Sequence, residues 1–313
     1  MDKKNILITG ASGFVGSRLF RAIQNHRSFS SFAVYRNKAK CDSVPHSIHI
    51  TDINAETDWL NNLPSKIDCV VHTAGVAHVL NGKTFEGDLN NAFLEVNVKG
   101  TLNLAKQLAK QGLKRFIFIS SIGVHGNATT GDPITEFSPL EPHNEYAKSK
   151  LDAEQGLKEL SRELGFELVI IRPVLIYALS APGNCGKLVK LIGRFPVLPF
   201  GSCNNARSMI SVNNLIDFII LCCYRPEAAN EDFVIADDLG VSTKQICDAI
   251  AKGLGKKVYE LPIPMALFRM IGILAKKEQK INQLIGDLQV DASKAKKLLG
   301  WSPNEKLHEG MLE

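Results

Sequence analysis

The sequence lacks a long hydrophobic run and a strong excess of either charge, and each absence excludes a class of protein. The most apolar later run, Leu215 to Cys223, is too short to cross a bilayer and contains Asp217. The first residues, Met1 to Lys4, lead straight into an apolar segment and leave no room for a signal peptide. The formal net charge of +5 over 313 residues is small, whereas nucleic-acid binding usually demands a clustered basic face. We expect a soluble cytoplasmic protein that binds neither nucleic acid nor a membrane.

Cysteine is scattered, and no cysteine pair has the C-x-x-C spacing or the spacing of metal ligands. We therefore expect reduced, mostly buried thiols and no metal site. The seven cysteines are Cys41, Cys69, Cys185, Cys203, Cys222, Cys223 and Cys247.

Glycine is concentrated where the chain first turns. The apolar run Asn5 to Ile8 leads into T-G-A-S-G-F-V-G at 9–16, which opens a segment with helical spacing. Gly10 can take the sharp turn out of a strand, Gly13 lets the backbone approach a pyrophosphate, and Gly16 lets the helix pack closely. The free N–H groups and the dipole of the helix N-terminus favour phosphate. This strand, turn and helix predict a dinucleotide site, although glycine-rich turns also serve plain packing.

Apolar segments alternate with helical patterns along the first half of the chain. Near-continuous apolar strands imply a parallel sheet covered on both faces. We expect an α/β fold, with a Rossmann-type doubly wound parallel sheet over 1–173. The predicted strands cover 5–8, 32–35, 47–50, 69–73, 115–120 and 167–171, and the clearest helices cover 93–111 and 146–164. Ligands bind beyond the carboxyl ends of such strands, where the sequence has Thr9, Arg36, Asp52, His72 and Ser121.

Proline and glycine interrupt the chain beyond Pro173, and an isolated strand is predicted over 233–236. We expect 174–313 to form mainly a smaller mixed C-terminal lobe that binds substrate, with a return of the chain to the sheet around 207–236. The segment from Met265 to Ala275 is apolar but contains Arg269. It predicts a packed amphipathic helix rather than a membrane anchor.

Tyr146 and Lys150 stand four residues apart, on one face of the predicted helix. A tyrosine is a poor base at neutral pH, but a neighbouring ammonium favours its phenolate and makes it a usable proton shuttle. Ser121, at the end of the fifth predicted strand, supplies a hydroxyl that can orient a substrate oxygen. The same spacing is also typical of surface pairs on helices.

Over nearly its whole length the chain resembles the extended short-chain dehydrogenases/reductases, the NAD-dependent epimerase/dehydratase family. Each motif is modest, but their order and spacing together are specific. They are the turn at 9–16, Asp52-Ile53, Val71 to Ala74, Asn97 to Thr101, Ser120-Ser121 with Val124 to Gly126, Tyr146 to Lys150, Arg172-Pro173, Arg207 before Ile210 to Val212, and Asp291 to Lys294 running into Leu299 to Pro303.

The resemblance implies a role for each matching residue. Tyr146 would be the acid/base, Lys150 would lower its pKa and hold the nicotinamide ribose, and Ser121 would hydrogen-bond the reacting sugar oxygen. Two residues, Asn184 and Arg207, would meet the nucleotide and diphosphate of the substrate. The other implied cofactor contacts are the turn residues Gly10, Ser12, Gly13, Phe14, Val15 and Gly16, then Asp52 and Ile53 at the adenine, Thr73 and Ala74 at the middle of the cofactor, and Pro173 at the nicotinamide.

For three of these motif residues a plain structural role is an alternative. Asn97 could only tie backbone together, Asp52 could only cap a helix, and Arg207 could form a surface ion pair. The resemblance also implies a homodimer.

Departures from the family pattern narrow the expected reaction. Ile122 and Gly123 stand where dehydratases of the family carry an acidic pair, and neither can move a proton. No acid follows the second strand, where the chain instead has Arg36, whose guanidinium suits a 2′-phosphate. We therefore favour NADP over NAD, with a basic surface loop as the alternative. Tyr177-Ala178 stands where the family often has Tyr-Gly-Pro, so the resemblance predicts no structure for the loop on the substrate side.

An NADP-binding site favours a reductase that consumes its cofactor over an epimerase that retains it. We expect hydride transfer at C4 of a UDP-linked hexose or deoxyhexosamine, in the direction of a 4-ketoreductase of surface-polysaccharide synthesis. One alternative is a UDP-hexose 4-epimerase. A more distant one is a non-catalytic dinucleotide-binding regulator, although such proteins commonly lose the tyrosine or lysine that this chain keeps.

Overall fold

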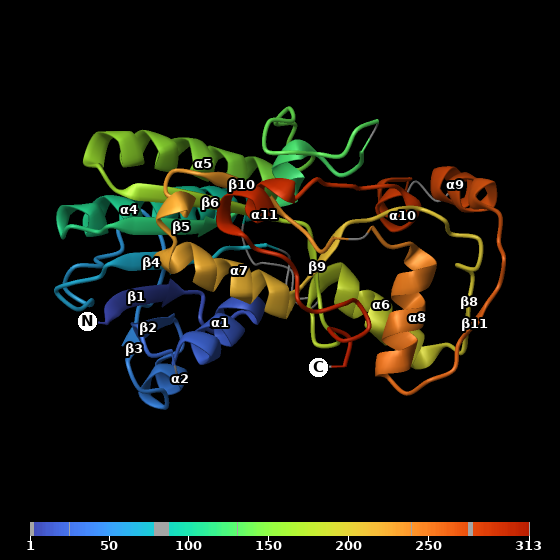
Figure 1. Cartoon of the computed structure of the whole chain (residues 1–313), viewed down its shortest axis with the longest axis horizontal. Coiled ribbons are helices and arrows are strands. Elements are labelled where there is room, and N and C mark those ends of the chain that lie inside the picture. Colours follow the sequence, from blue (N-terminus) through green and yellow to red (C-terminus); the bar gives the residue numbers. More distant parts are fainter. Residues whose placement is uncertain are drawn as a thin grey trace. The chain divides into compact units, whose positions relative to one another are not determined.

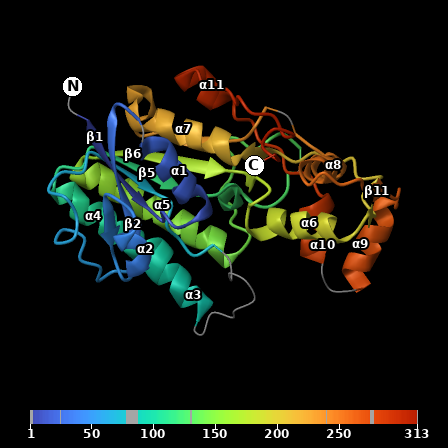
Figure 2. The same ribbon diagram turned by 90° about the horizontal axis from the view of Figure 1, so that it is seen from below.

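The computed structural model describes residues 3–24, 26–77, 88–129, 131–238, 240–274 and 278–312 (Figures 1 and 2). In chain order the helices and strands are β1 (Lys4–Thr9), α1 (Phe14–Gln24), β2 (Phe29–Tyr35), α2 (Lys38–Asp42), β3 (Ser47–His49), β4 (Cys69–His72), α3 (Leu89–Ala92), η2 (Phe93–Gly100), α4 (Thr101–Lys110), β5 (Arg115–Ile119), η3 (Ile122–His125), α5 (Glu145–Leu164), β6 (Glu167–Pro173), β7 (Leu175–Tyr177), α6 (Gly183–Arg194), β8 (Val197–Leu198), β9 (Met209–Ser211), α7 (Val212–Tyr224), η4 (Pro226–Ala228), β10 (Asp232–Ile235), α8 (Thr243–Gly253), β11 (Tyr259–Glu260), α9 (Met265–Leu274), α10 (Glu278–Ile285) and α11 (Ser293–Leu299).

Seven strands form one sheet in the order β10-β6-β5-β4-β1-β2-β3. The pairs from β3 to β6 are parallel, and the strand order reverses between β1 and β4, as in a doubly wound sheet. Figure 1 shows α4 and α5 on one face and α1 and α7 on the other. The predicted Rossmann-type fold is confirmed.

The main hydrophobic core lies between the sheet and the helices α4 and α5. Val70 and Phe116 point into it from the strands, and Leu104 and Leu157 from the helices, all without solvent exposure. Such helices are fixed by their apolar face. The ends of α5 are set locally, because Asn144 caps its first turn and Gly165 takes a left-handed conformation (φ 77°) after its last.

The chain divides into two compact units. The first comprises Met1–Val124, Leu140–Arg172 and Ile216–Phe233, and it contains most of the seven-stranded sheet. The second comprises His125–Pro139, Pro173–Leu215 and Val234–Glu313. The second unit includes the parallel pairs β7–β9 and β8–β11 and the helices α6 and α8 to α11.

Two predicted elements differ from the structure. The strand predicted at 233–236 is β10, which is not isolated but is an edge strand of the large sheet beside β6, in agreement with the expected return of the chain to the sheet around 207–236. The helix predicted over 93–111 is interrupted, since η2 is π-helical and only α4 is regular. A π-helical stretch inside a helix often marks a functional site.

All seven cysteines are buried and free, as predicted. In the part of the chain that the structure describes, no helix has the length and apolar character needed to span a membrane.

Candidate active site

The glycine turn between β1 and α1 forms a tight, open cradle. Gly10 has a φ of 71°, and a Cβ there would lie 2.7 Å from the Ala74 nitrogen. A Cβ on Gly16, the third residue of α1, would lie 2.3 Å from the Gly10 carbonyl oxygen, so only glycine fits at this position. Ser12 and Gly13 are exposed just before the first residue of α1. Exposed backbone at a helix N-terminus fits a pyrophosphate, as the sequence predicts.

His72 ties this turn to the neighbouring helix from a fully buried position. Its Nδ1 lies 2.8 Å from the Thr9 hydroxyl, and its Nε2 lies 2.9 Å from the Thr101 hydroxyl. Thr101 donates its proton to the carbonyl of Asn97 (2.7 Å), so His72 must donate from Nε2 and accept at Nδ1. Burial, aided by the Lys150 ammonium, lowers the pKa of His72 to about 3. His72 is therefore a neutral connector and not a proton carrier.

Tyr146 and Lys150 lie one turn apart near the start of α5. The Lys150 ammonium donates to the carbonyl of Ile119 at the end of β5 (2.8 Å) and lies 4.4 Å from the centroid of the Phe118 ring. The ring of Tyr146 packs near that of Phe93 on η2, with centroids 6.2 Å apart. Helix α5 thus directs both side chains to one region of the first unit, beyond the carboxyl end of β5.

Ser121 lies beside the same end of α5. Its Oγ accepts from the Gly123 N–H (3.1 Å), and a Cβ on Gly123 would lie 3.3 Å from that Oγ and 3.4 Å from the Ala147 Cβ. Ala147 directly follows Tyr146, so Ser121 lies near the first turn of α5, the turn that carries the predicted acid/base.

Burial moves the pKa of each group of the tyrosine–lysine pair toward its neutral form. It raises the pKa of Tyr146 to about 12. It lowers the pKa of Lys150 to about 8, and the negative charge of Glu154 opposes that change. In the protein by itself, burial outweighs the effect expected from the neighbouring ammonium at Tyr146.

Glu154 belongs to a buried ion-pair network that fastens α5 to the sheet. Its Oε2 and Oε1 accept from Nη2 and Nε of Arg172 (2.7 and 3.0 Å), and both side chains are 1% exposed. Arg172 also contacts Asp232 (2.9 Å), which pairs with Lys158 (2.6 Å). Sequence reasoning missed Glu154, although its position one turn beyond Lys150 was a usable signal.

Asn97 ties backbone together, the structural alternative considered for it. Its Oδ1 accepts from the Val76 N–H (2.7 Å), and its Nδ2 donates to the Val76 carbonyl (2.9 Å) and to the Ser149 hydroxyl (3.0 Å). Asn97 therefore links the segment after β4 to η2 and α5, and it holds the residues around Lys150 in place.

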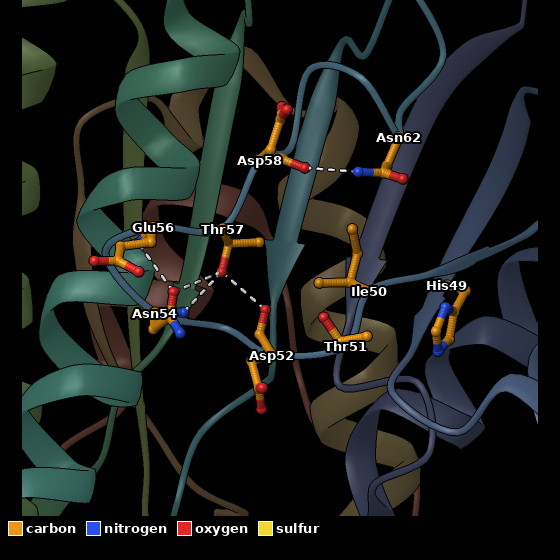
Figure 3. Close-up of a pocket in the computed structure, with 9 residues that line it drawn as sticks. All are labelled: His49, Ile50, Thr51, Asp52, Asn54, Glu56, Thr57, Asp58 and Asn62. Carbon is orange, nitrogen blue, oxygen red and sulfur yellow. Dashed lines mark hydrogen bonds between the residues drawn. The ribbon is translucent and has the colours of Figure 1, made fainter.

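The segment after β3 forms an open pocket that includes Asp52 (Figure 3). The Asp52 carbonyl accepts from the Thr57 hydroxyl (2.8 Å), and Figure 3 shows its carboxylate pointing away from Asp58 and Asn62. Ile53 is buried against Gly100. A Cβ on Gly100 would lie 2.8 Å from the Cγ2 of Ile53. The pocket is lined by His49, Ile50, Thr51, Asp52, Asn54, Glu56, Thr57, Asp58 and Asn62. Its three carboxylates suit an uncharged ring better than a phosphate.

The other residues predicted to contact a cofactor follow the strands of the first unit or end β6. Thr73 donates its hydroxyl proton to the Thr9 carbonyl (2.6 Å), which brings it and Ala74 beside Gly10. Arg36 follows β2 with an exposed side chain. Pro173 is buried and is the last residue of β6.

The predicted substrate residues lie in the second unit on separate elements. Asn184 is exposed in the first turn of α6, 3.5 Å from the Lys187 ammonium. Arg207 is half-buried and donates to the carbonyl of Gly286 (2.8 Å), and its backbone bonds to Val241 (2.9 and 2.8 Å). Burial lowers the pKa of Arg207, and Asp287 opposes that change.

In the described ranges no group of three or more His, Cys, Asp or Glu side chains has an arrangement that could hold a metal ion. The groups that lie near the end of β5 and the start of α5 are the Tyr146 phenol, the Lys150 ammonium and the Ser121 hydroxyl.

Comparison with known proteins gives three findings. The model of the NAD dependent epimerase/dehydratase family matches residues 6–236. A UDP-glucose 4-epimerase of Vibrio cholerae is 39% identical over 98% of this chain and 93% of its own length. An N-acetyl-alpha-D-glucosaminyl-diphospho-ditrans,octacis-undecaprenol 4-epimerase of Escherichia coli O157:H7 is 30% identical over 84% of this chain and 76% of its own.

The fold also matches solved structures. The crystal structure of a UDP-glucuronic acid 4-epimerase from Bacillus cereus, in complex with NAD, superimposes with a TM-score of 0.75 at 19% identity. It covers 98% of this chain and 96% of that one. At this identity the likeness concerns the fold alone.

Proposed function

Because the chain belongs to the NAD dependent epimerase/dehydratase family, we propose that it is a UDP-hexose 4-epimerase. It would invert C4 of the sugar by removing a hydride from C4 and the proton of its hydroxyl, and then returning the hydride to the opposite face of the 4-keto sugar and the proton to its oxygen. The observation that carries this proposal is the Ser121, Tyr146 and Lys150 arrangement at the carboxyl end of β5, beside the glycine cradle.

The chain's own residues would do the proton chemistry. Tyr146 would take the proton of the C4 hydroxyl while Ser121 donates a hydrogen bond to the same oxygen. Lys150, anchored on the Ile119 carbonyl, would stabilise the phenolate and bind the ribose of the cofactor. The cofactor, a nicotinamide dinucleotide whose phosphates suit the cradle at Gly10 and Gly13, supplies hydride acceptance and return.

Two relatives support epimerisation over reduction. The proteins from Vibrio cholerae and Escherichia coli are both named as 4-epimerases of a sugar on a diphosphate, one carried by uridine and the other by undecaprenol. The greater identity to the first supports a UDP-sugar. Asn184 and Arg207 would bind its nucleotide and diphosphate, since a guanidinium pairs well with phosphate oxygens.

The experiment that tests the proposal incubates purified protein with UDP-glucose and a catalytic amount of NAD, and separates the sugar nucleotides by anion-exchange chromatography. We expect UDP-galactose to appear without net production of NADH, and Tyr146→Phe to abolish its formation. A parallel reaction with UDP-N-acetylglucosamine tests the substituent at C2. Failure of both sugars to interconvert would contradict the proposal.

A 4-ketoreductase is the second candidate, and Arg36 favours it. The exposed guanidinium follows β2, where an acidic residue would favour NAD. Oxidation of NADPH by a UDP-4-keto sugar, without interconversion of UDP-hexoses, would favour this candidate over the first. A non-catalytic regulator is less well supported, because the chain keeps Tyr146, Lys150 and Ser121.

Arg36→Ala separates the two cofactors. Loss of the guanidinium should weaken NADP binding by about 1–3 kcal/mol and spare NAD, since only the 2′-phosphate loses a charge-assisted partner. Titration calorimetry with each dinucleotide measures the difference, and Lys40→Ala, in the exposed α2 nearby, is the matched control. Equal weakening of NADP and NAD binding would show that Arg36 is a surface residue that does not contact the 2′-phosphate.

The resemblance to the family supports a homodimer and a cytoplasmic location as further predictions. Sedimentation velocity of the purified protein tests the first, and fractionation of the source cell tests the second.

A further inference from the structure

Helix α9, in the second unit, has both buried and exposed apolar residues among the side chains that the structure describes. Its Phe268 is buried and stacks on the ring of Phe200, with centroids 5.9 Å apart and planes at 13°. The packed helix predicted for this segment therefore forms, but it leaves large apolar side chains outside. The exposed fractions are 38% for Leu267, 50% for Met270, 60% for Ile273 and 76% for Leu274. Leu267, Met270 and Leu274 follow the spacing of one helical face.

The strands next to α9 expose apolar side chains as well. Tyr259 of β11 pairs with Val197 of β8, and their exposed fractions are 70% and 46%. The stack of Phe200 on Phe268 joins this strand pair to α9, because Phe200 closely follows β8. We call Val197, Tyr259, Leu267, Met270, Ile273 and Leu274 the apolar group. Monomeric proteins rarely leave such groups uncovered without a binding role.

The chain segments that carry the apolar group are also strongly basic. Residues 183–203 contain no acid, and residues 249–274 contain only Glu260. The Glu260 side chain is 6% exposed and pairs with Lys244 (3.3 Å). The basic side chains of these two segments, all exposed, are Lys187, Lys190, Arg194, Lys252, Lys256, Lys257 and Arg269.

We propose that this part of the second unit binds the surface of an anionic lipid bilayer, with the apolar group in the interface and the basic residues facing lipid headgroups. At ten residues α9 is too short to span a bilayer but long enough to lie in its surface. Basic side chains are attracted to an anionic leaflet. The same positive charges would repel one another if a second copy covered this face. This inference goes beyond the proposed function and departs from our expectation from the sequence that no membrane is bound.

Vesicle co-sedimentation of the full-length protein tests the proposal. The probes are vesicles of phosphatidylcholine alone and vesicles in which a third of the lipid is phosphatidylglycerol. We expect wild-type protein to pellet with the anionic vesicles and to be released by high salt, because exposed charges are screened. Binding to the neutral vesicles should be at least about tenfold weaker.

Three variants assign the binding to this surface. The double variant Met270→Glu with Ile273→Glu should lower binding to anionic vesicles about tenfold or more, because it puts charge into the interface. Lys257→Gln with Arg269→Gln should weaken binding to anionic vesicles only. Phe137→Glu is the matched control, since Phe137 is 90% exposed in a different segment of the same unit, and it should bind like wild type.

Several results would overturn the proposal. They are a wild-type protein that stays in the supernatant with both vesicles, a Met270 and Ile273 variant that still pellets, and a Phe137 variant that loses binding equally. Conversion of a wild-type dimer to a monomer by the Met270 and Ile273 changes, without vesicle binding, would assign the face to a second copy. Assaying the same samples with UDP-glucose keeps this outcome separate from that of the proposed function.

Discussion

Each of the two units contains a tyrosine whose pKa is raised, and the charged groups near the two tyrosines differ in sign. In the first unit Tyr146 has the Lys150 ammonium one helical turn away on α5. In the second, Tyr177 at the end of β7 donates to a carboxylate oxygen of Asp237 (2.8 Å). Burial raises the pKa of both tyrosines, to about 12 at Tyr146, and the Asp237 charge raises that of Tyr177 further.

The pKa is raised at both phenols, so the difference between them lies in the neighbouring charge. A carboxylate fixes the Tyr177 hydroxyl as a permanent donor, and Asp237 is held in turn by the Asn214 amide (2.7 Å) and the Ser211 N–H (3.2 Å). At Tyr146 the neighbouring charge is the Lys150 ammonium, and a positive charge favours the phenolate. We therefore predict proton transfer at Tyr146 and a structural role for Tyr177.

Removing the hydroxyl of each tyrosine in turn tests this comparison with the largest expected effect. Tyr146→Phe should lower kcat for UDP-hexose interconversion by about 10²–10⁴-fold, the usual worth of a positioned acid/base. Tyr177→Phe should keep kcat within about tenfold, since its hydroxyl moves no proton. Steady-state kinetics of the two variants, with circular dichroism to verify folding, measures both. Equal losses would show that the sign of the neighbouring charge does not distinguish the two tyrosines.

The buried ion pair of Glu154 with Arg172 should contribute more to the stability of the first unit than a half-exposed ion pair does. Arg172→Met leaves Glu154 buried without its partner and should cost about 3–5 kcal/mol of unfolding free energy. Lys99→Met, which removes the half-exposed pair of Lys99 with Glu95, should cost less than about 1 kcal/mol. Urea unfolding of both variants gives the two values. Similar losses would mean that the Arg172 network does not hold α5 on the sheet.

The carboxylate beside Tyr177 should make the second unit sensitive to pH. Burial raises the pKa of Asp237 to about 6, although its hydrogen bonds from Asn214 and Tyr177 oppose the change. A raised acid pKa contributes stability that is complete below the unfolded value of about 4 and is lost as the pH rises through 6. Asp237→Asn should remove this loss, which is about 1–3 kcal/mol. Unfolding free energies of wild type and variant between pH 4 and 7 test it. The same dependence of unfolding free energy on pH in wild type and in Asp237→Asn would contradict this prediction.

The smallest predicted effect concerns Glu154, whose negative charge raises the pKa of Lys150. Glu154→Gln removes a carboxylate one turn away, so the pKa of Lys150 should fall below about 8. Activity that needs the ammonium should then be lost at a lower pH, by about one unit. The pH profile of kcat/KM measures the shift, and Glu159→Gln, exposed on the same helix, should leave the profile in place. An unmoved profile in Glu154→Gln would limit Glu154 to a structural role.

The two parts of the chain were not equally predictable from the sequence. In the first unit, the strands β1, β2, β4, β5 and β6 lie within a few residues of their predicted ranges, because continuous apolar runs between turn residues specify buried parallel strands. The irregular second unit carries no such period. Its pairs β7–β9 and β8–β11 are strands of two or three residues, too short for a pattern of alternation to appear.

Other features depend on contacts between residues far apart in the chain. The π-helical η2 is held by Asn97 and by the close approach of Gly100 to Ile53. The exposed face of α9 could likewise not be predicted, because every residue of the segment except Arg269 and Gly272 is apolar.

The sequence alone determined the alternation of strands and helices, the glycine turn and the spacing of Tyr146 and Lys150, because backbone sterics and side-chain periodicity act over a few neighbouring residues. Tertiary structure alone decided that His72 is a neutral link between Thr9 and Thr101, and that Glu154 and Arg172 are a buried pair. Burial and charge environment depend on which distant segments pack together, and no local pattern encodes that packing.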